Sequence, residues 1–281
     1  MSIQIKMHMR LKKLSSSSLW RDSLNVTTGI FTVIASVFTV ANIKLDDVIV
    51  GTAWWQRCMI LLAALFVILI IASFVKVINS YKKKTLSIRG IKVIIRQGDI
   101  FKSSGWKVIP FNEYYDTEVN DIVIAKNSLN GRFILEHVSN IKELNRRISQ
   151  ERKIMNSSKC SSDEAQFHLG HIITINDYML LAFSHFKDNQ AILSYKDYKD
   201  CLLNMWHEIS RVYANKPITI PLLGGGITRF KDLPEVEDAQ LLQNLLLSLK
   251  DSMVHINQPI TILLTREAME NIDLYNIKNV F

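Results

Sequence analysis

The stretch Pro217 to Arg229, which carries the main fold signal of the sequence, reads Pro-Ile-Thr-Ile-Pro-Leu-Leu-Gly-Gly-Gly-Ile-Thr-Arg. The apolar, β-branched run from Ile218 to Ile220 predicts a buried strand. Three consecutive glycines follow it, and a helical pattern resumes near Pro234. Glycines let the backbone adopt φ > 0 and bring its N–H groups close to an anion, so this order suits a phosphate cradle. An ordinary strand-to-helix loop is the alternative, because the stretch matches neither the Walker loop nor the spaced dinucleotide motif.

The composition favours a protein that works at a membrane. The 281 residues carry a formal net charge of +8 together with a positive mean hydropathy of +0.11. Much of the basic charge lies beside apolar runs, which is typical of membrane proteins. The three cysteines are far apart and odd in number, so they predict no disulfide framework and favour a reducing compartment.

Two apolar runs within residues 1–84 predict a transmembrane hairpin, with helices at about 24–43 and 56–78. The first run contains no charged residue and is just long enough to span the hydrocarbon core as a helix. The second is more apolar and follows Trp54 and Trp55, where an interfacial aromatic belt would lie. A signal peptide is the alternative for the first run, but its apolar region would be long and would begin late.

The distribution of charge predicts the orientation of this hairpin. Basic residues flank its outer ends, namely Lys6, Arg10, Lys12, Lys13 and Arg21 before the first helix and Lys76, Lys82, Lys83 and Lys84 after the second. The connecting loop, Lys44 to Arg57, carries two basic residues against Asp46 and Asp47. We therefore expect a two-pass protein of the inner (cytoplasmic) membrane with both termini in the cytoplasm.

The first predicted helix also carries hydroxyl and amide groups that could bond to other helices. These polar residues are Thr32, Ser36, Thr39 and Asn42. They could support self-association or line a pore. A plain two-helix anchor with a few hydroxyls is the alternative.

From residue 85 onward the pattern becomes that of a globular α/β domain. A hairpin is predicted around Arg89 and Gly90. Further strands are expected at 107–110, 172–176, 178–186 and 260–264, and helices at 140–155, 194–214, 239–249 and from 266. A polar loop is expected at 156–166. Because strands and helices alternate in the second half, we predict a mixed, largely parallel sheet flanked by helices.

Three segments in this order resemble the macro domain, the α/β fold that binds ADP-ribose. Gly98-Asp99-Ile100 after a strand resembles the motif at the adenine end of the site. Asn127 to Gly131 stands where the first phosphate loop should be, and Pro221 to Arg229 stands where the second should be. The resemblance covers most of residues 85–281 and implies a cytoplasmic macro domain there.

The match is closer to one subgroup. Gly-Asp-Ile-Phe at 98–101, Val-Ile-Pro-Phe-Asn-Glu-Tyr-Tyr-Asp-Thr at 108–117, Ser-Leu-Asn-Gly at 128–131 and the glycine stretch resemble the membrane-anchored macro-domain effectors of type II Thoeris anti-phage systems. The resemblance implies that a TIR-domain partner makes the signal, a histidine–ADP-ribose conjugate. Binding of that signal would activate the effector and lead to abortive infection. The implied partners are this enzyme, acting through the small molecule, membrane lipids and further copies of the chain.

The resemblance also implies roles for individual residues. Asp99 would read the adenine edge, backbone amides of the two loops would hold the diphosphate, and Asn112, Glu113 and Asp116 would lie near the distal ribose and its substituent. The implied ligand-binding residues are Asp99, Ile100, Asn112, Glu113, Asp116, Ser128, Leu129, Asn130, Gly131, Leu223, Gly224, Gly225, Gly226, Ile227, Thr228 and Arg229.

We expect a binding protein without catalytic residues, metal or cofactor. Enzymatic macro domains carry Asn-Ala-Ala-Asn where this chain has Pro110-Phe111-Asn112-Glu113, and the first loop keeps only Gly131. The sequence also lacks a nucleophile elbow, and no cysteine–histidine spacing matches a common zinc pattern. Nucleic-acid binding is not expected, because the basic residues cluster at the predicted membrane. The alternative function is a membrane-tethered hydrolase of ADP-ribose or ADP-ribosyl groups.

Overall fold

The structure is a computed structural model of the 281-residue chain. It describes residues 17–40, 53–80, 83–157, 166–188, 190–226, 228–233, 236–274 and 277. The chain divides into two compact units, one comprising Met1–Lys83 with Asp273–Phe281 and the other comprising Lys84–Ile272.

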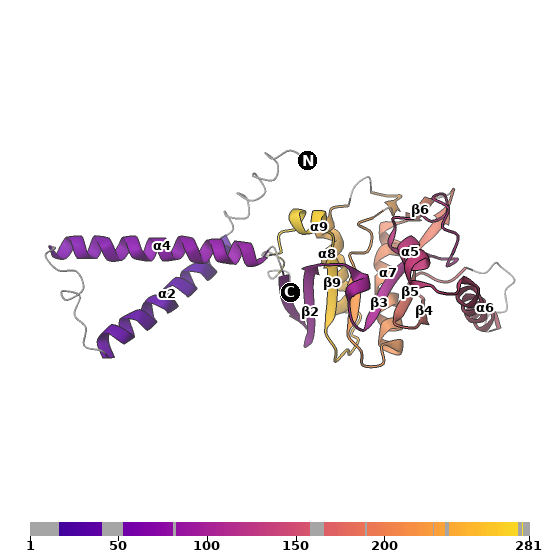
Figure 1. The fold of residues 1–281 in the computed structure, drawn as a ribbon, viewed down its shortest axis with the longest axis horizontal. Helices are drawn as coiled ribbons and strands as arrows, with labels where there is room; N and C mark the ends of the chain where they lie inside the picture. Colours follow the sequence, from indigo (N-terminus) through magenta and orange to yellow (C-terminus); the bar gives the residue numbers. More distant parts are fainter. Residues whose placement is uncertain are drawn as a thin grey trace. The chain divides into compact units, whose positions relative to one another are not determined.

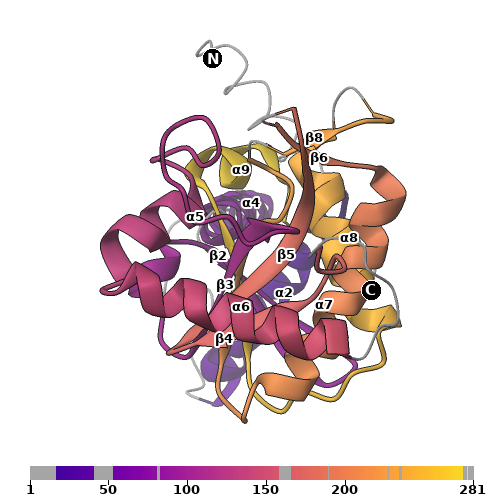
Figure 2. The same cartoon turned by 90° about the vertical axis from the view of Figure 1, so that its right-hand side faces the viewer.

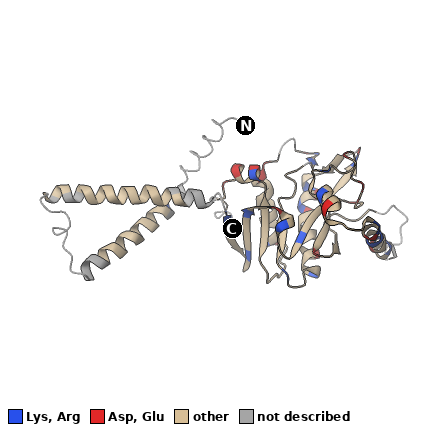
Figure 3. Ribbon diagram, viewed as in Figure 1, with Lys and Arg blue, Asp and Glu red and all other residues tan. Residues whose placement is uncertain are grey.

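The first unit contains two long helices, α2 (Ser17–Val40) and α4 (Trp54–Ser80), which contact each other. They overlap the two predicted spans, although residues 41–43 of the first lie outside the described residues. Several large apolar side chains of α4 are exposed, among them Leu62 and Phe66 at 61% and 62%. The described side chains of α4 include no charged group between Met59 and Ser73 (Figure 3). Among the described residues, no helix has the combined length and apolar character required to cross a membrane.

The second unit is built on a sheet to which the described residues contribute nine strands (Figure 1). They are β1 (Lys83–Ile88), β2 (Ile91–Gln97), β3 (Trp106–Asn112), β4 (Ile172–Ile175), β5 (Tyr178–Lys187), β6 (Gln190–Leu193), β7 (Ile218–Pro221), β8 (Arg229–Phe230) and β9 (Ile260–Leu264). Their order is β1-β2-β9-β7-β3-β5-β6-β8, with β4 paired to β5 outside this path.

The pairing confirms a mixed, largely parallel sheet. Neighbours from β2 through β9, β7 and β3 to β5 are all parallel, whereas β5 pairs antiparallel with β4 and β6. Five adjacent strands therefore end at the same side of the sheet, which we call the carboxyl edge. In open α/β sheets ligands bind in the crevice outside this edge.

Helices cover both faces of the sheet. They are η1 (Ile100–Lys102), α5 (Leu129–Arg132), η2 (Phe133–His137), α6 (Ile141–Ser157), α7 (Tyr195–Val212), α8 (Asp238–Asp251) and α9 (Arg266–Asn271). Figure 2 shows α5 and α6 on one side of β3 and β5, with α7 and α8 on the other. Phe111, Phe133 and Leu144 belong to a buried cluster that joins β3, η2 and α6. The Trp206 indole N–H donates to Ser248 Oγ at 2.9 Å and thereby ties α7 to α8.

Most elements agree with the predictions, including the short strands β4 and β9 and the short helix α9, and a few short ones were missed. The predicted helix at 194–214 is α7, which begins after the N-cap Ser194 and buries an apolar stripe that includes Leu202 and Trp206. No pattern had indicated β6, β8 or the helical segment from α5 through η2. The predicted helix at 239–249 is α8, which runs from Asp238 to Asp251. Positions 158–165 of the predicted polar loop lie outside the described residues.

Candidate functional site

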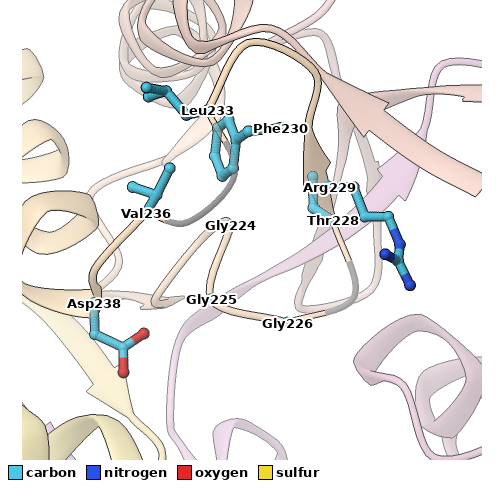
Figure 4. Close-up of a pocket in the computed structure, with 9 residues that line it drawn as sticks. All are labelled: Gly224, Gly225, Gly226, Thr228, Arg229, Phe230, Leu233, Val236 and Asp238. Atoms are coloured by element: carbon cyan, nitrogen blue, oxygen red, sulfur yellow. The ribbon is translucent and has the colours of Figure 1, made fainter.

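The glycine run after β7 borders a pocket at the carboxyl edge. The pocket has a cavity volume of about 330 Å³ and is lined by Gly224, Gly225, Gly226, Thr228, Arg229, Phe230, Leu233, Val236 and Asp238. Figure 4 shows the glycines on one side and Phe230, Leu233 and Val236 facing them. Five residues of the predicted second phosphate loop thus line one cavity. Ile227, a sixth, lies outside the described residues.

Gly224 and Gly226 differ in how strongly the structure requires glycine. Gly224 has φ +88°, and a Cβ added there would lie 3.1 Å from Leu241 Cδ2 and 3.3 Å from Phe230 Cζ. A side chain at this position would be strained by its backbone conformation and crowded by its neighbours. At Gly226 an added Cβ would meet nothing within 4 Å. Gly224 therefore shapes the loop, while Gly226 leaves open space along the pocket.

Tyr198 of α7 packs against the glycine loop from the buried side. It is fully buried, and its hydroxyl donates to the Leu223 carbonyl oxygen at 3.2 Å. Burial raises the pKa of the Tyr198 phenol well above its ordinary value, so the hydroxyl stays a donor at physiological pH. Its ring packs edge-on against Phe230, with the centroids 5.4 Å apart. The predicted contact residue Leu223 is itself buried, at 1% exposure, and offers only its backbone to the site.

The two charged residues of the pocket lie at opposite ends of the glycine run. Asp238, the first residue of α8, is beside Gly225, and Arg229 follows Thr228 at the other end (Figure 4). The side chain of Arg229 is exposed and points away from the cavity (Figure 4). Burial is the main cause that raises the pKa of the Asp238 carboxyl. The charge of Glu267 adds to this effect, and a hydrogen bond with the Asn271 side chain opposes it.

Asp99, the predicted adenine reader, follows β2 at the same carboxyl edge. Its Oδ1 accepts the Phe101 N–H at 3.1 Å and so caps η1. Its Oδ2 lies 3.5 Å from a guanidinium nitrogen of Arg132, which also bonds to Glu136 and covers the Phe101 ring at 4.7 Å. About one third of the Asp99 side chain is exposed (33%). Ile100, by contrast, is buried in the apolar cluster, so only its backbone can serve a ligand.

The predicted first phosphate loop is a tightly bonded turn that leads into α5. Ser128 caps this helix, because its Oγ accepts the Gly131 N–H at 3.1 Å. The Ser128 N–H donates to the Ala125 carbonyl oxygen at 3.0 Å. Two of the four amides predicted to hold phosphate are therefore engaged within the turn, leaving those of Leu129 and Asn130 as the candidates. Gly131 is required by packing, since a Cβ there would lie 2.2 Å from the Ala125 oxygen.

Asn112 organises the turn that follows β3. Its amide nitrogen donates to Asp116 Oδ2 at 2.8 Å, and its Oδ1 accepts the N–H groups of Tyr114 and Asp116. Asn112 is buried and Asp116 is half-buried. Both side chains are thus committed to the turn, which positions the backbone beside the carboxyl edge.

Glu113 forms a pair that the sequence did not indicate. Its Oε2 lies 2.5 Å from Nδ1 of His185, near the end of the neighbouring strand β5. The Glu113 side chain is 6% exposed, whereas that of His185 is 37% exposed and its Nε2 lies 4.0 Å from Asp197 Oδ2. The buried carboxylate therefore orients an imidazole whose outer edge reaches solvent. Only strand pairing brings these residues together, across 72 positions of sequence.

The predicted site residues thus lie in separate clusters along one edge. Asp99 follows β2, the glycines follow β7, and Asn112 ends β3; β9 separates β2 from β7, whereas β7 and β3 are neighbours. With strands spaced about 4.8 Å apart, β2 and β3 are separated by roughly 14 Å. Within the part of the chain that the structure describes, no group of three or more His, Cys, Asp or Glu side chains could hold a metal ion.

Comparison with known proteins places these features in a family. Residues 93–265, more than half of the chain, match the sequence model of the macro domain of Thoeris protein ThsA. The chain belongs to the Thoeris ThsA macro-domain family. Thoeris protein ThsA of Bacillus amyloliquefaciens (strain Y2) is 35% identical to it over 232 residues, which cover 78% of this chain and 77% of that protein. This membership confirms the macro-type fold that the sequence predicted.

Two solved macrodomain structures of Oceanobacillus iheyensis are also similar to this ThsA-family chain. One, with ADP, is 14% identical with a TM-score of 0.45 and covers 70% of this chain and 94% of that one. A variant with ADPR is 12% identical with a TM-score of 0.47 and covers 70% of this chain and 96% of that one. The ThsA match from 93 to 265 includes Asp99, both predicted phosphate loops and the Glu113–His185 pair.

Proposed function

We propose that this chain is a membrane-bound Thoeris effector that senses an ADP-ribose-derived signal through its macro domain. The observation that carries the proposal is the shared carboxyl edge of β2, β7 and β3, where Asp99, the glycine pocket and the Asn112 turn are aligned. The ligand class that matches this order has a nucleobase at one end and a diphosphate in its middle. The nucleobase amino group would donate to the carboxylate, and the backbone amides would bind the diphosphate. Membership of the ThsA family supports a role in anti-phage defence.

The signal in this proposal is a histidine–ADP-ribose conjugate made from NAD by a TIR-domain partner. The effector needs no cofactor, because recognition rests on hydrogen bonds and charge. Its partners are that enzyme, which acts through the small molecule, and other copies of the same chain.

The helices α2 and α4 supply the membrane part of the proposal. Exposed apolar side chains of α4, such as Met59, Leu62 and Phe66, give it a surface that is costly to leave in water. Basic residues flank both outer ends of the helix pair in the sequence. We place the protein in the inner membrane with both termini in the cytoplasm, where ligand binding leads to oligomerisation or membrane disruption and abortive infection.

The test is a titration of the full chain, kept in mild detergent, with ADP-ribose, NAD and a histidine–ADP-ribose conjugate while thermal unfolding is followed. A ligand at about 100 times its Kd should stabilise the protein by about 2.7 kcal/mol. The largest shift is expected for the conjugate. Gly225→Val should remove the shift, because its side chain enters the space beside the glycine run, where an added Cβ already lies 3.2 Å from Asp238 Oδ1. The unfolding temperature of this variant without ligand is measured in the same experiment, so that loss of binding is separated from loss of folding. A flat response of the unaltered protein to all three ligands would reject the sensor.

A hydrolase is the second candidate function, and the Glu113–His185 pair is the observation that favours it. A solvent-reaching imidazole oriented by a buried carboxylate is the usual form of a general base. Incubating the protein with the conjugate and measuring release of free histidine separates the candidates. Stoichiometric binding without product supports the sensor, while turnover that disappears in His185→Gln supports the hydrolase.

A further inference from the structure

Arg96, near the end of β2, places a guanidinium beside Gly98 at the carboxyl edge. A Cβ added to Gly98 would lie 3.0 Å from Arg96 Nη1 and 3.1 Å from Leu263 Cδ2. The φ of Gly98 is outside the left-handed region, so its backbone conformation does not require glycine. The absence of a side chain at position 98 instead leaves the space in which the guanidinium lies.

The register of the sheet places this guanidinium between β2 and the glycine run. Arg96 pairs with Leu263 of β9, and Leu263 pairs with Pro221 of β7. Side chains of directly paired residues lie on the same face of a sheet. The Leu222 N–H, just before the glycine run, donates to the Leu263 carbonyl oxygen at 3.0 Å. Two strand spacings, roughly 10 Å, therefore separate β2 from β7, and the guanidinium lies against the strand between them.

Within the part of the chain that the structure describes, no carboxylate pairs with the Arg96 guanidinium. Asp99, three positions later, pairs instead with Arg132, which also bonds to Glu136. At the glycine pocket, Arg229 points away from the cavity (Figure 4). Arg96 is half-buried, so water screens its charge only in part. This guanidinium is therefore available to an anion that lies along the carboxyl edge.

We propose that Arg96 binds the diphosphate of the ADP-ribose-derived ligand, on the side of its adenosine. The guanidinium lies between Asp99, the proposed adenine reader, and the glycine run, whose amides hold the phosphates in the proposed function. A guanidinium donates two parallel hydrogen bonds to phosphate oxygens and adds a positive charge that backbone amides lack. This inference rests on the proposed function, because it assumes that the ligand extends from Asp99 to the glycine run.

The test is calorimetric titration of the full chain in mild detergent, with ADP-ribose and a histidine–ADP-ribose conjugate as probes. Arg96→Gln removes the charge and should weaken binding of either probe about tenfold at low salt, the loss expected for one charge-assisted hydrogen bond. The loss should shrink between about 0.01 M and about 1 M salt, because the Debye length falls from roughly 30 Å to roughly 3 Å.

Lys92→Gln is the matched control for this charge. Lys92 is an exposed cation on the same face of the same strand, four residues before Arg96 and roughly 13 Å farther from the carboxyl edge. Its replacement removes one positive charge from β2 but none from the proposed ligand site. Lys92→Gln should therefore leave the affinity for both probes unchanged at both salt concentrations.

Gly98→Ala keeps the inference testable if Arg96→Gln fails to fold. Its Cβ enters the space beside Arg96 Nη1, so it should displace the guanidinium and weaken binding more at low salt than at high salt. Where Arg96→Gln folds, the same substitution added to it should cause a smaller loss, because the displaced group is already gone. Thermal unfolding without ligand shows which variants are folded.

Three results would overturn the role of Arg96 and leave the sensor intact. They are an unchanged affinity in Arg96→Gln, a loss of the same size at both salt concentrations, and fully additive losses for Arg96→Gln and Gly98→Ala. Failure of the unaltered protein to bind either probe would instead overturn the proposed function, and this inference with it.

Discussion

Tyr198 holds Leu223 in place: the phenol hydroxyl of α7 donates to the Leu223 carbonyl oxygen at 3.2 Å and lies 3.3 Å from the Leu241 carbonyl oxygen of α8. The residue just before the glycine run is thus fixed to two helices at once. Since phosphate-binding amides are effective only when their direction is fixed before the ligand arrives, this contact links the core to the site.

Tyr198→Phe should therefore lower the free energy of unfolding slightly and weaken ligand binding more strongly. Loss of one buried hydrogen bond costs about 1 kcal/mol of unfolding free energy, which urea denaturation would measure. We also expect weaker ADP-ribose binding in calorimetry. Tyr195→Phe is the control, because among the residues that the structure describes its hydroxyl bonds to the side chains of Gln240 and Asn244 and not to the glycine loop. Equal losses of ligand affinity in the two variants would show that the Tyr198 hydroxyl does not fix the position of the glycine loop.

The glycines of the pocket should respond differently to the same substitution. Gly224→Ala forces an L-residue into φ +88° and brings its Cβ to 3.1 Å from Leu241, so we expect a loss of about 1–2 kcal/mol. Gly226→Ala meets open space and should change stability by less than about 0.5 kcal/mol. Thermal unfolding of both variants would check this, and an unchanged melting temperature in Gly224→Ala would contradict the assigned backbone conformation.

Stability should fall in acid because of His171. Burial lowers the pKa of this imidazole from 6.5 to about 4 in the folded protein. Between these values the unfolded chain binds the proton and the folded protein does not, so unfolding becomes easier as the pH drops from 6.5 towards 4. His171→Gln should flatten this part of a urea-midpoint profile, whereas His207→Gln, at an exposed site on α7, should leave its slope unchanged. A slope that survives in His171→Gln would assign it to other groups.

Asp238 should make stability depend on pH in the opposite direction from His171. Its pKa is raised above 3.8 in the folded protein, so the native state holds the proton more tightly and stability is lost as the pH rises through the raised value. Asp238→Asn should remove that loss, and its advantage in unfolding free energy over the unaltered protein should grow from pH 4 upward. The measurement is a set of denaturation curves across that range, and an advantage that shrinks with pH would contradict the burial of this carboxyl.

The Glu113–His185 pair should show strong coupling in a double-mutant cycle. Because Glu113 is buried, replacing either residue by Ala leaves the other without its partner, and we expect a coupling free energy of about 1–2 kcal/mol. The exposed pair Lys126–Asp121, at 3.0 Å, is the comparison and should couple by less than about 0.5 kcal/mol. Similar coupling free energies in the two pairs would mean that burial does not strengthen the Glu113–His185 interaction.

The sequence predicted the elements that carry long periodic patterns, and it missed contacts created by the sheet. The strand–glycine–helix order located the pocket, and the apolar stripe of α7 located its support. Nothing in the spacing of Glu113 and His185 indicated a pair, because parallel strands join residues of any separation. The first phosphate loop was predicted as four free amides, yet the capping hydroxyl of Ser128 occupies one of them, that of Gly131. Such local bonds depend on rotamers that a periodic pattern does not encode.

The ion pair between Asp99 and Arg132 gives the adenine-binding part and the diphosphate-binding part of the proposed site opposite responses to salt. Dissolved ions screen exposed charges, so added salt loosens this partly exposed pair and frees the carboxylate for an adenine amino group. The same ions weaken the attraction between the polypeptide and a diphosphate. As the ionic strength rises, the affinity for ADP-ribose, which contains both the adenine and the diphosphate, should therefore fall less steeply than the affinity for inorganic pyrophosphate. Arg132 therefore competes with the adenine amino group for the Asp99 carboxylate.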